Sequence, residues 1–597
     1  MNELELKKKM KELEQKISQL PPGGISTKKI NGKVYFYHRI TKDQKRVETY
    51  IDFDHVDILR EGIQTRKSLE KELKQLKRML VIKQSKPVLL PDEMFSTYVR
   101  TGTQLQRLAE PVRKYKKREC YSVLSDFIFG EQQDKVFILY GLRRTGKTTL
   151  IRQILLDMTP EQLEKTAFMQ MKSTDTLSQV NRDLKQLEQM GYAYVFIDEV
   201  TLMEDFIEGA ALFSDIYASS GMKIVLSGTD SLGFVFTKSD QLYDRCILLH
   251  TTFIPYREFE NVLGIKGIDE YIQYGGTMSM SGVNYNEVSS FVSDKSTSEY
   301  IDSAIAWNIQ HSLKYYQDGR HFRHLYALYE QKELTSAINR VVEDMNHRFT
   351  KEVLTRTFKS GDLSVSARNL LHDLETPIDL LENIDRDGVT KTLMSMLDIL
   401  NKDQQSVLVD ETHAYQIREY LLLLDLIMEI DLRYLPNVNQ HDKVTVICQP
   451  GLRYAQAKAL IDSLLLDKTF SRLSLQERHR ISERILSEIK GRMMEDIVLL
   501  ETKLANPHKQ VFKLQFAVGE FDMVIHDPVA LSCEVFEIKH SSERVPAQYK
   551  YLIDTEKCAD TEHRFGPITN KTVIYRGETV TDNRIPYLNV EEYLKSL

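Results

Sequence analysis

Tryptophan and cysteine are scarce in this sequence: its 597 residues include one tryptophan and five cysteines. The cysteines stand far apart, with neither the spacing of a zinc site nor that of a disulfide framework. We expect them to be small buried side chains in a reducing, cytoplasmic setting. The sequence also lacks an apolar run of the roughly 18 residues that a membrane-spanning helix needs, so we expect no membrane partner.

Positive charge is not in excess either, because 80 lysines and arginines face 86 aspartates and glutamates. The formal net charge of −6 excludes a global basic field, so nucleic-acid binding would have to come from local patches. Hydrophobic residues make up 42% of the chain, an ordinary share for a soluble protein. At the usual domain size, this length predicts about three or four domains.

Residues 1–86 predict a coiled-coil hairpin with a β tip. Apolar side chains recur at four- and three-residue steps over residues 6–20, and a second such stripe covers residues 69–80. Between them, residues 33–41 and 46–51 are rich in aromatic and β-branched side chains, which favours two strands. The hairpin either positions or dimerises the protein, or serves as an arm for nucleic acid or a protein partner.

Residues 87–120 are predicted to form a basic linker. This stretch either lies on DNA or packs beside the domain that follows, and the sequence leaves both alternatives open. Its basic residues are Arg107, Arg113, Lys114, Lys116, Lys117 and Arg118.

A phosphate-binding loop is predicted where the apolar run 136–140 meets the sequence GLRRTGKTT, within the domain expected at residues 121–285. Its glycines let the backbone approach phosphate closely, and a helix begins directly after the loop. Lys147 is expected to reach the β- and γ-phosphates of ATP, and Thr148 to ligate Mg²⁺. The residues predicted to hold the nucleotide here are Gly141, Arg144, Thr145, Gly146, Lys147, Thr148 and Thr149.

Two further strand-like runs complete the predicted nucleotide site. Residues 194–197 end in Asp198 and Glu199; the aspartate is expected to hold the Mg²⁺ shell and the glutamate to orient or deprotonate water. Residues 223–226 end in Ser227, which would sense the γ-phosphate if its strand lies beside that of Asp198. A polar turn is the competing interpretation for Ser227.

The stretches GLRRTGKTTL, YVFIDEV and LSGTDS, in this order, resemble the archaeal-type ATPase family, an AAA-like branch of the P-loop ATPases with an additional catalytic glutamate. The resemblance runs from Ser122 to the C-terminus. It implies an α/β fold with a parallel sheet flanked by helices, and ATP and Mg²⁺ as cofactors. Relatives carry a Gly-Arg pair where this chain has Asp244 and Arg245, which leaves Arg245 as a γ-phosphate or inter-subunit arginine. A homo-oligomer through this domain or the N-terminal hairpin remains open.

Residues 286–480 are predicted to form a helical and winged-helix region. A helix-like run at 414–427 precedes two strand-like runs at 429–434 and 443–448, the outline of a winged helix, and relatives commonly have one at this point. Winged helices bind DNA through a recognition helix, but they also serve as packing modules. The apolar character of the run 414–427 favours packing.

Residues 481–597 resemble the PD-(D/E)xK restriction-endonuclease-like fold: Glu495 lies in a helix-like run, Asp522 on a strand, and Glu537 and Lys539 on the next strand. Because alternate residues of a strand share a face, Glu537 and Lys539 project together. The resemblance implies a metal site formed by Asp522, Glu537 and Glu495, with Lys539 positioning or activating water. The alternative is an edge strand with solvated charges.

These features together predict an ATP-hydrolysing P-loop protein coupled to a metal-dependent DNA nuclease, in defence or mobile-element biology. The alternative is an ATP-dependent switch or assembly protein whose C-terminal domain binds nucleic acid without cutting it. DNA is the expected partner, although the residues do not separate DNA from RNA.

Overall fold

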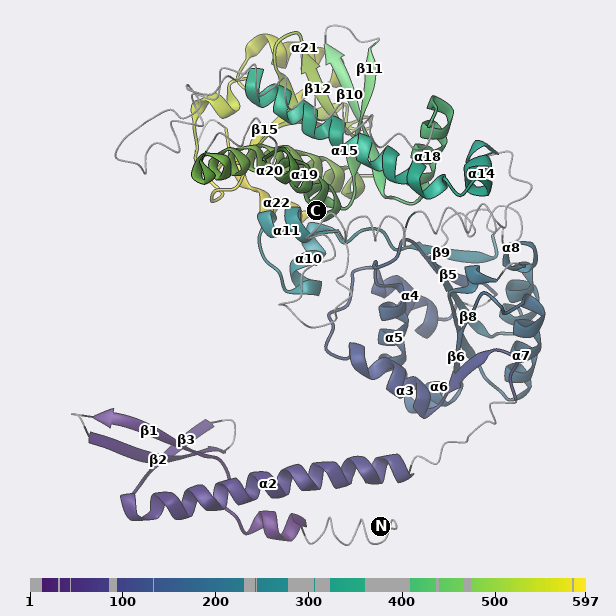
Figure 1. Cartoon of the computed structure of the whole chain (residues 1–597), viewed down its shortest axis with the longest axis vertical. Coiled ribbons are helices and arrows are strands. Elements are labelled where there is room, and N and C mark those ends of the chain that lie inside the picture. The colour runs from purple at the N-terminus through teal and green to yellow at the C-terminus, as the bar shows by residue number, and fades with distance from the viewer. Residues whose placement is uncertain are drawn as a thin grey trace. The chain divides into compact units, whose positions relative to one another are not determined.

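The protein divides into two compact units, Met1–Phe95 and Ser96–Leu597, which are described separately (Figure 1). Within the described residues, none of the helices is both long and apolar enough to cross a membrane. Residues 6–12 of the first apolar stripe and residues 87–93 of the predicted linker lie outside the described residues. The computed structural model describes residues 13–30, 33–42, 45–84, 94–132, 134–203, 205–229, 242, 244–276, 305, 323–359, 409–435, 440–465, 474–581 and 585–597.

The N-terminal unit consists of an antiparallel three-stranded sheet and a long helix (Figure 1). Residues 33–41 and 46–51, expected as strands, lie within β2 and β3, and a third strand, β1, precedes them. The bounds are β1 (Gly24–Ile30), β2 (Lys33–Lys42), β3 (Lys45–Ile51) and α2 (Phe53–Gln84).

A short helical stretch at residues 13–18 docks against α2 through hydrogen bonds and apolar burial. The guanidinium Nη1 of Arg66 donates to the carbonyl oxygens of Ile17 and Leu20, at 2.9 and 2.7 Å. Ile17 is buried, as are Val56 and Ile63 on α2. The two helices of the unit are therefore joined at residues 17–20.

The second unit begins with a six-stranded sheet in the order β4-β6-β7-β8-β5-β9. Strands β6, β7, β8, β5 and β9 run parallel to one another. The edge strand β4 is antiparallel to its neighbour β6. Parallel strands need crossover connections, which explains the alternation of strand and helix along this part of the chain. The bounds are β4 (Tyr98–Thr101), β5 (Val136–Tyr140), β6 (Thr166–Gln170), β7 (Tyr194–Asp198), β8 (Lys223–Gly228) and β9 (Cys246–His250).

Helices cover this sheet, and three of them contribute buried side chains to a cluster with its strands. Leu105 of α3, Leu124 of α4 and Ile151 of α5 share one buried cluster with Phe137 of β5 and Phe196 of β7. The helices are α3 (Thr103–Ala109), α4 (Tyr121–Phe129), α5 (Lys147–Asp157), α6 (Pro160–Glu164), α7 (Leu177–Gln189) and α8 (Phe206–Gly209).

The stretch from Ser96 to residue 120, within the predicted linker, packs beside this sheet, which was one of its two alternatives. The backbone amides of Ser96 and Thr97 donate to the Asp183 carboxylate at 2.8 and 2.7 Å, and β4 then pairs with β6. The strand β4 is only four residues long, Tyr98–Thr101, and the basic residues that suggested a linker follow it.

A seven-stranded mixed sheet follows, in the order β11-β10-β12-β13-β14-β15-β16. The hairpin expected as a wing is β10 and β11, and β10 also pairs in parallel with β12. The hairpin therefore extends the C-terminal sheet, and the expected boundary at residue 480 falls inside helix α20. The bounds are β10 (Ile427–Leu435), β11 (His441–Ile447), β12 (Gln510–Phe516), β13 (Glu520–Asp527), β14 (Ser532–Lys539), β15 (Ile568–Tyr575) and β16 (Tyr587–Asn589).

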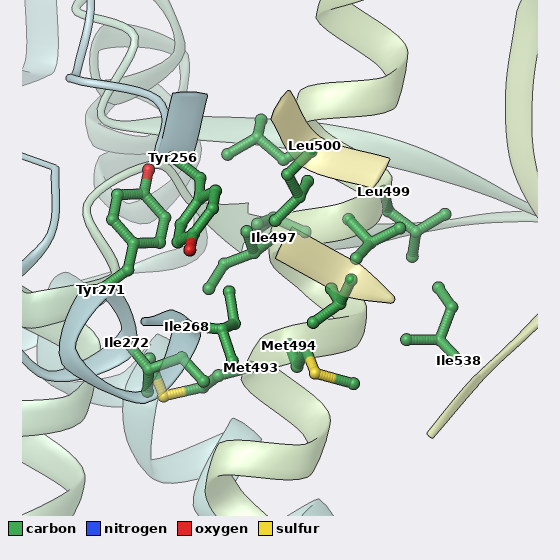
Figure 2. Close-up of a cluster of buried hydrophobic side chains, with 14 of the residues drawn as sticks. Tyr256, Ile268, Tyr271, Ile272, Met493, Met494, Ile497, Leu499, Leu500 and Ile538 are labelled. Atoms are coloured by element: carbon green, nitrogen blue, oxygen red, sulfur yellow. The ribbon is translucent and has the colours of Figure 1, made fainter. Parts of the chain in front are cut away.

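Helix α20 forms the centre of the largest buried cluster in this unit (Figure 2). Its residues Met494 and Ile497 share this cluster with Tyr256 and Tyr271, which follow the six-stranded sheet, and with Ile538 of β14. The remaining helices are α10 (Tyr256–Leu263), α11 (Ile268–Tyr274), α14 (Arg323–Glu330), α15 (Leu334–Lys359), α18 (Glu411–Leu423), α19 (Pro450–Leu465), α20 (Leu475–Ala505), α21 (Thr555–Phe565) and α22 (Val590–Ser596).

Candidate functional site

The loop between β5 and α5 has the backbone that a phosphate-binding loop requires. Gly141 has a φ of 137°, and a Cβ there would lie 2.3 Å from the carbonyl oxygen of Thr251, so only glycine fits. Gly146, with a φ of 96°, precedes the first turn of α5. Lys147 is buried, and its ammonium donates to the carbonyl oxygens of Gly141 and Leu142, each at 2.8 Å. The side chain of Lys147 thus contacts the backbone of its own loop.

The carboxylate side of the site lies at the ends of the neighbouring strands β7 and β8, which pair in parallel. Asp198 Oδ1 accepts a hydrogen bond from Ser227 Oγ at 2.7 Å, and Asp198 Oδ2 accepts one from Thr148 Oγ1 at 3.2 Å. The strand adjacency on which the expectation for Ser227 depended is therefore present. Asp198 lies between the helix that follows the loop and the end of β8.

Glu199 leaves β7 in a strained conformation, with a φ of 56°. Its carboxylate Oε2 accepts a hydrogen bond from Thr229 Oγ1 at 3.4 Å. Burial, and then the charge of Asp198, raise the pKa of Glu199 above its usual range. Burial lowers the pKa of Lys147 to about 8, against the opposing pull of Glu199 and Asp198. Burial thus disfavours the charged forms of both Glu199 and Lys147. Perturbed pKa values of this kind are found at many functional sites.

Other predicted residues of the nucleotide site lie in different surroundings. Arg144 has a φ of 67° at the top of the loop, and Thr149 is half-buried in the first turn of α5. Thr145 donates from Oγ1 to the Leu142 carbonyl oxygen at 2.8 Å. Arg245 instead forms an ion pair with Asp215, at 2.7 Å, and both side chains are half exposed. Within the described chain, Arg245 is therefore engaged away from the carboxylates of the site.

The C-terminal carboxylates and lysine converge on adjacent strands. Lys539 Nζ lies 2.8 Å from Asp522 Oδ2 and 2.6 Å from Glu537 Oε2, and the backbone amide of Ile538 also donates to Asp522 at 2.7 Å. Burial, and then the charge of Asp522, raise the pKa of Glu537 well above its usual range. Burial alone would lower the pKa of Lys539, but Asp522 and Glu537 hold it above its ordinary value.

These three side chains line a cavity of about 330 Å³. Sequence reasoning missed two of its polar residues, Gln515 and Glu520. Glu520 could have been found, because it stands two residues before Asp522 on β13 and so shares its face. The complete lining is Gln515, Phe516, Ala517, Gly519, Glu520, Asp522, Glu537, Lys539 and Tyr551.

Glu495 is engaged differently from the metal ligand that was expected. Its carboxylate Oε2 is 2.6 Å from Arg492 and 3.0 Å from Lys513. Burial opposes ionisation, but Lys513 and Arg492 lower the pKa of Glu495 to about 2. Among the described residues, no group of three or more histidine, cysteine, aspartate or glutamate side chains is placed to hold a metal. Glu495 is therefore paired with Arg492 and Lys513, whereas Asp522 and Glu537 lie together at Lys539.

The donor set of that pair still suits a hard divalent cation, which prefers carboxylate oxygens. Glu537 Oε1 is buried without a hydrogen-bond partner among the described residues, although its other oxygen meets Lys539. An orphaned buried carboxylate oxygen is costly, and a cation would relieve that cost. Two carboxylates leave the other coordination positions to water and phosphate oxygens, as is usual for Mg²⁺.

Comparison with known proteins identifies the nucleotide-binding part. Residues 133–260 match the family described as the AAA domain, and this segment holds the loop, Asp198, Glu199 and Ser227. The chain therefore contains an AAA-type P-loop domain. None of the curated proteins matches the chain.

Solved structures resemble the chain only distantly. The Orc1 protein of Aeropyrum pernix, in complex with DNA, is 15% identical over 65% of this chain and 97% of its own, with a TM-score of 0.19. Cdc6p of Pyrobaculum aerophilum is 10% identical over 64% of this chain and 97% of its own, with a TM-score of 0.20. Hsp104 of S. cerevisiae, in complex with casein, is 12% identical over 47% of this chain and 52% of its own, with a TM-score of 0.24. TM-scores this low carry no argument about function.

Proposed function

We propose that this protein binds and hydrolyses ATP at the loop between β5 and α5. The observation that carries the proposal is the position of Asp198 and Glu199, two carboxylates at the end of β7, opposite a buried lysine on the loop. A buried glutamate with a raised pKa is a better base at neutral pH than an exposed one. A nucleotide store would not need that second carboxylate.

Each residue of the site has a separate task in this reaction. Lys147, now bonded to two carbonyl oxygens, would exchange them for phosphate oxygens, which carry more negative charge. Thr148 and Asp198 would hold Mg²⁺, since a hydroxyl and a carboxylate already meet there at 3.2 Å. Ser227 keeps the Asp198 carboxylate oriented, and Glu199 would accept a proton from the attacking water.

Steady-state ATP turnover of the Lys147→Ala variant tests this function. We expect loss of turnover with the fold retained, because alanine cannot bridge the phosphates. Lys185→Ala is the matched control, since Lys185 is an exposed lysine on α7 of the same domain. Turnover in Lys147→Ala equal to that of the control would remove the nucleotide assignment.

A second activity, metal-dependent cleavage of DNA, is favoured by one observation in the C-terminal cavity. Asp522, Glu537 and Lys539 meet within hydrogen-bond distance there, as the metal-binding and water-activating groups of a phosphodiesterase would. We propose DNA as the substrate and Mg²⁺ as the ion that Asp522 and Glu537 hold. The AAA-type domain would then control the cutting through ATP.

Cleavage of plasmid and single-stranded DNA with Mg²⁺ or Mn²⁺, with and without ATP, tests this second function. Asp522→Asn should abolish cutting, whereas Asp527→Asn, at a half-buried position at the far end of the same strand, should not. Dependence on ATP would show that the AAA-type domain controls the cavity. If ATP is hydrolysed and nothing is cut, the alternative of a switch that binds nucleic acid without cleavage takes precedence.

A further inference from the structure

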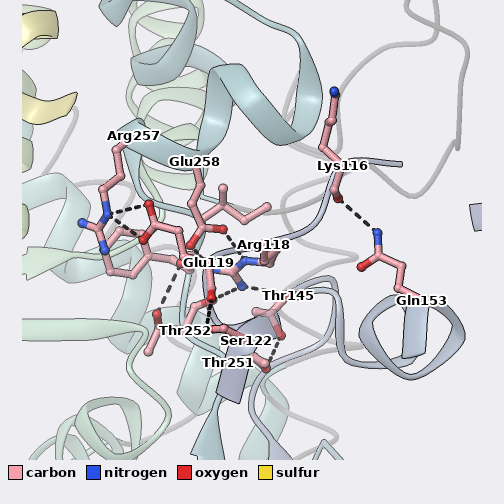
Figure 3. A network of polar contacts seen from close by, with 12 residues as sticks. Lys116, Arg118, Glu119, Ser122, Thr145, Gln153, Thr251, Thr252, Arg257 and Glu258 are labelled. Carbon is pink, nitrogen blue, oxygen red and sulfur yellow. Dashed lines mark hydrogen bonds and ion pairs between the residues drawn. The ribbon is translucent and has the colours of Figure 1, made fainter. Parts of the chain in front are cut away.

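We propose that Arg118 and Glu258 are positioning residues of the nucleotide site, which hold the phosphate-binding loop in the shape that receives ATP. The inference rests on the proposed ATP-binding function and adds two residues that do not touch the nucleotide. Both side chains are almost fully buried, with exposed fractions of 6% and 5%. Figure 3 shows them between the loop and the start of α10.

The guanidinium of Arg118 joins three separate segments of the chain. Its Nε donates to Glu258 Oε2 at 2.7 Å, and its Nη1 donates to the carbonyl oxygen of Thr145 at 2.9 Å. The same group reaches the carbonyl oxygens of Thr252 and Phe253, each at 3.2 Å. A planar guanidinium with a fixed fork of donors is suited to such a junction, which a lysine could not reproduce.

The contact with Thr145 determines the direction of a phosphate-binding amide. A trans peptide is planar, so its C=O and N–H point in opposite directions. Arg118 fixes the carbonyl of Thr145, and therefore also the N–H of Gly146, the residue before Lys147. The Thr145 side chain is fixed as well, since its Oγ1 lies 2.8 Å from both the Leu142 carbonyl oxygen and Thr251 Oγ1.

The helix that carries Glu258 is anchored by the C-terminal part of the unit. It lies on α10, and the backbone amide of Tyr256 at the start of α10 donates to Glu501 Oε1 of α20 at 2.7 Å. Tyr256 also shares the buried cluster with Ile497 of α20 and with Ile538, the residue between Glu537 and Lys539 (Figure 2). The pair is thus held in place from both the loop and α20.

The experiment separates positioning from a merely structural ion pair. Removing one partner of a buried pair leaves an unpaired charge and is strongly destabilising, whereas replacing both by apolar side chains of similar volume often preserves the fold. The double variant Arg118→Met with Glu258→Met should therefore fold without an unpaired buried charge. Its thermal midpoint should fall moderately, because the carbonyl oxygens of Thr145, Thr252 and Phe253 lose their donor.

We expect the KM for ATP in the double variant to rise about tenfold or more, with a smaller change in kcat, because a hydrogen bond from a charged donor to the loop is lost. Binding of a fluorescent ATP analogue should weaken in parallel. Arg118→Lys, which keeps the charge and lacks the fork, should show an intermediate rise and serves if the double variant does not fold.

An unchanged KM in either folded variant overturns the proposal. Lys147→Ala, measured beside them, keeps this failure distinct from failure of the ATP function. If Lys147→Ala is inactive while Arg118→Lys and the double variant bind ATP normally, only the positioning role is lost. If Lys147→Ala retains full turnover, the nucleotide assignment itself fails.

Discussion

The nucleotide site and the C-terminal cavity each bring a lysine and two carboxylates to one edge of a sheet, but they pair the lysine differently. Lys147 donates to neutral carbonyl oxygens of its own loop, away from Asp198 and Glu199. Lys539 instead contacts both carboxylates of its cavity. The positive charge of Lys147 is therefore available for an anion, whereas that of Lys539 is paired with Asp522 and Glu537.

The pKa shifts follow from this difference. With neutral partners, burial dominates and lowers the pKa of Lys147 to about 8. With two carboxylates in contact, burial is outweighed and the pKa of Lys539 is raised. Under the functions proposed above, the nucleotide site would receive phosphate directly. The C-terminal cavity would need a cation at its carboxylates before Lys539 could act.

The largest effect on this comparison should come from Glu199→Gln. The amide cannot accept the proton of the attacking water, so kcat for ATP should fall by roughly 10²- to 10⁴-fold while nucleotide binding is kept. Turnover and binding of a fluorescent ATP analogue measure the two separately. Glu164→Gln, an exposed glutamate on α6, is the matched control. An unchanged kcat would show that Glu199 is not the base in ATP hydrolysis.

Lys539→Met tests the pairing of the lysine with two carboxylates in the C-terminal cavity. It leaves Asp522 and Glu537 without their cation. Because the Lys539 side chain is 31% exposed, we expect a smaller loss in the free energy of unfolding than the roughly 3 to 5 kcal/mol of a fully buried pair. Mn²⁺ should restore part of this stability, because it replaces the lost positive charge, and a chelator should remove the restored part again. Thermal melting with and without Mn²⁺ measures the effect. The absence of any metal-induced shift in Lys539→Met would argue against a cation at these carboxylates.

Glu501→Gln tests the helix that joins the two regions. Burial raises the pKa of Glu501 from an ordinary 4.5 to about 7, so the folded protein holds this proton more tightly than the unfolded chain. Its stabilisation is complete below pH 4.5 and is lost as the pH rises to 7, by up to roughly 3 kcal/mol. Glutamine keeps an acceptor for the Tyr256 amide and does not titrate. The stability of Glu501→Gln relative to the unchanged protein should therefore increase between pH 5 and 7 in denaturant titrations, and a constant difference would contradict this.

Arg245→Ala should have the smallest effect. The ion pair of Arg245 with Asp215 is half exposed, so its removal should cost less than about 1 kcal/mol of stability and leave ATP turnover by the single chain unchanged. Urea titration and steady-state turnover check both parts. Loss of turnover with normal stability would instead favour the inter-subunit arginine that the family resemblance implies.

The nucleotide site was largely predictable because its main signals are contiguous. A strand, a glycine-containing loop and a helix follow one another in residues 136–157. Each of the three is indicated by the residues within it. The role of Ser227 was conditional, because its place beside Asp198 depends on the order of β7 and β8 in the sheet. The edge strand β4 was not predicted, since a strand of four residues has little periodic signal.

The sequence by itself determined the P-loop, the alternation of strands and helices around it, and the spacing that puts Glu537 and Lys539 on one face of β14. Only the tertiary structure decided which partners each charge has. It placed Arg118 beneath Thr145, gave Glu495 to Arg492 and Lys513, and joined the hairpin β10–β11 to the C-terminal sheet. Such pairings join residues far apart in the chain, and buried charges depend on the full set of neighbours that folding brings around them.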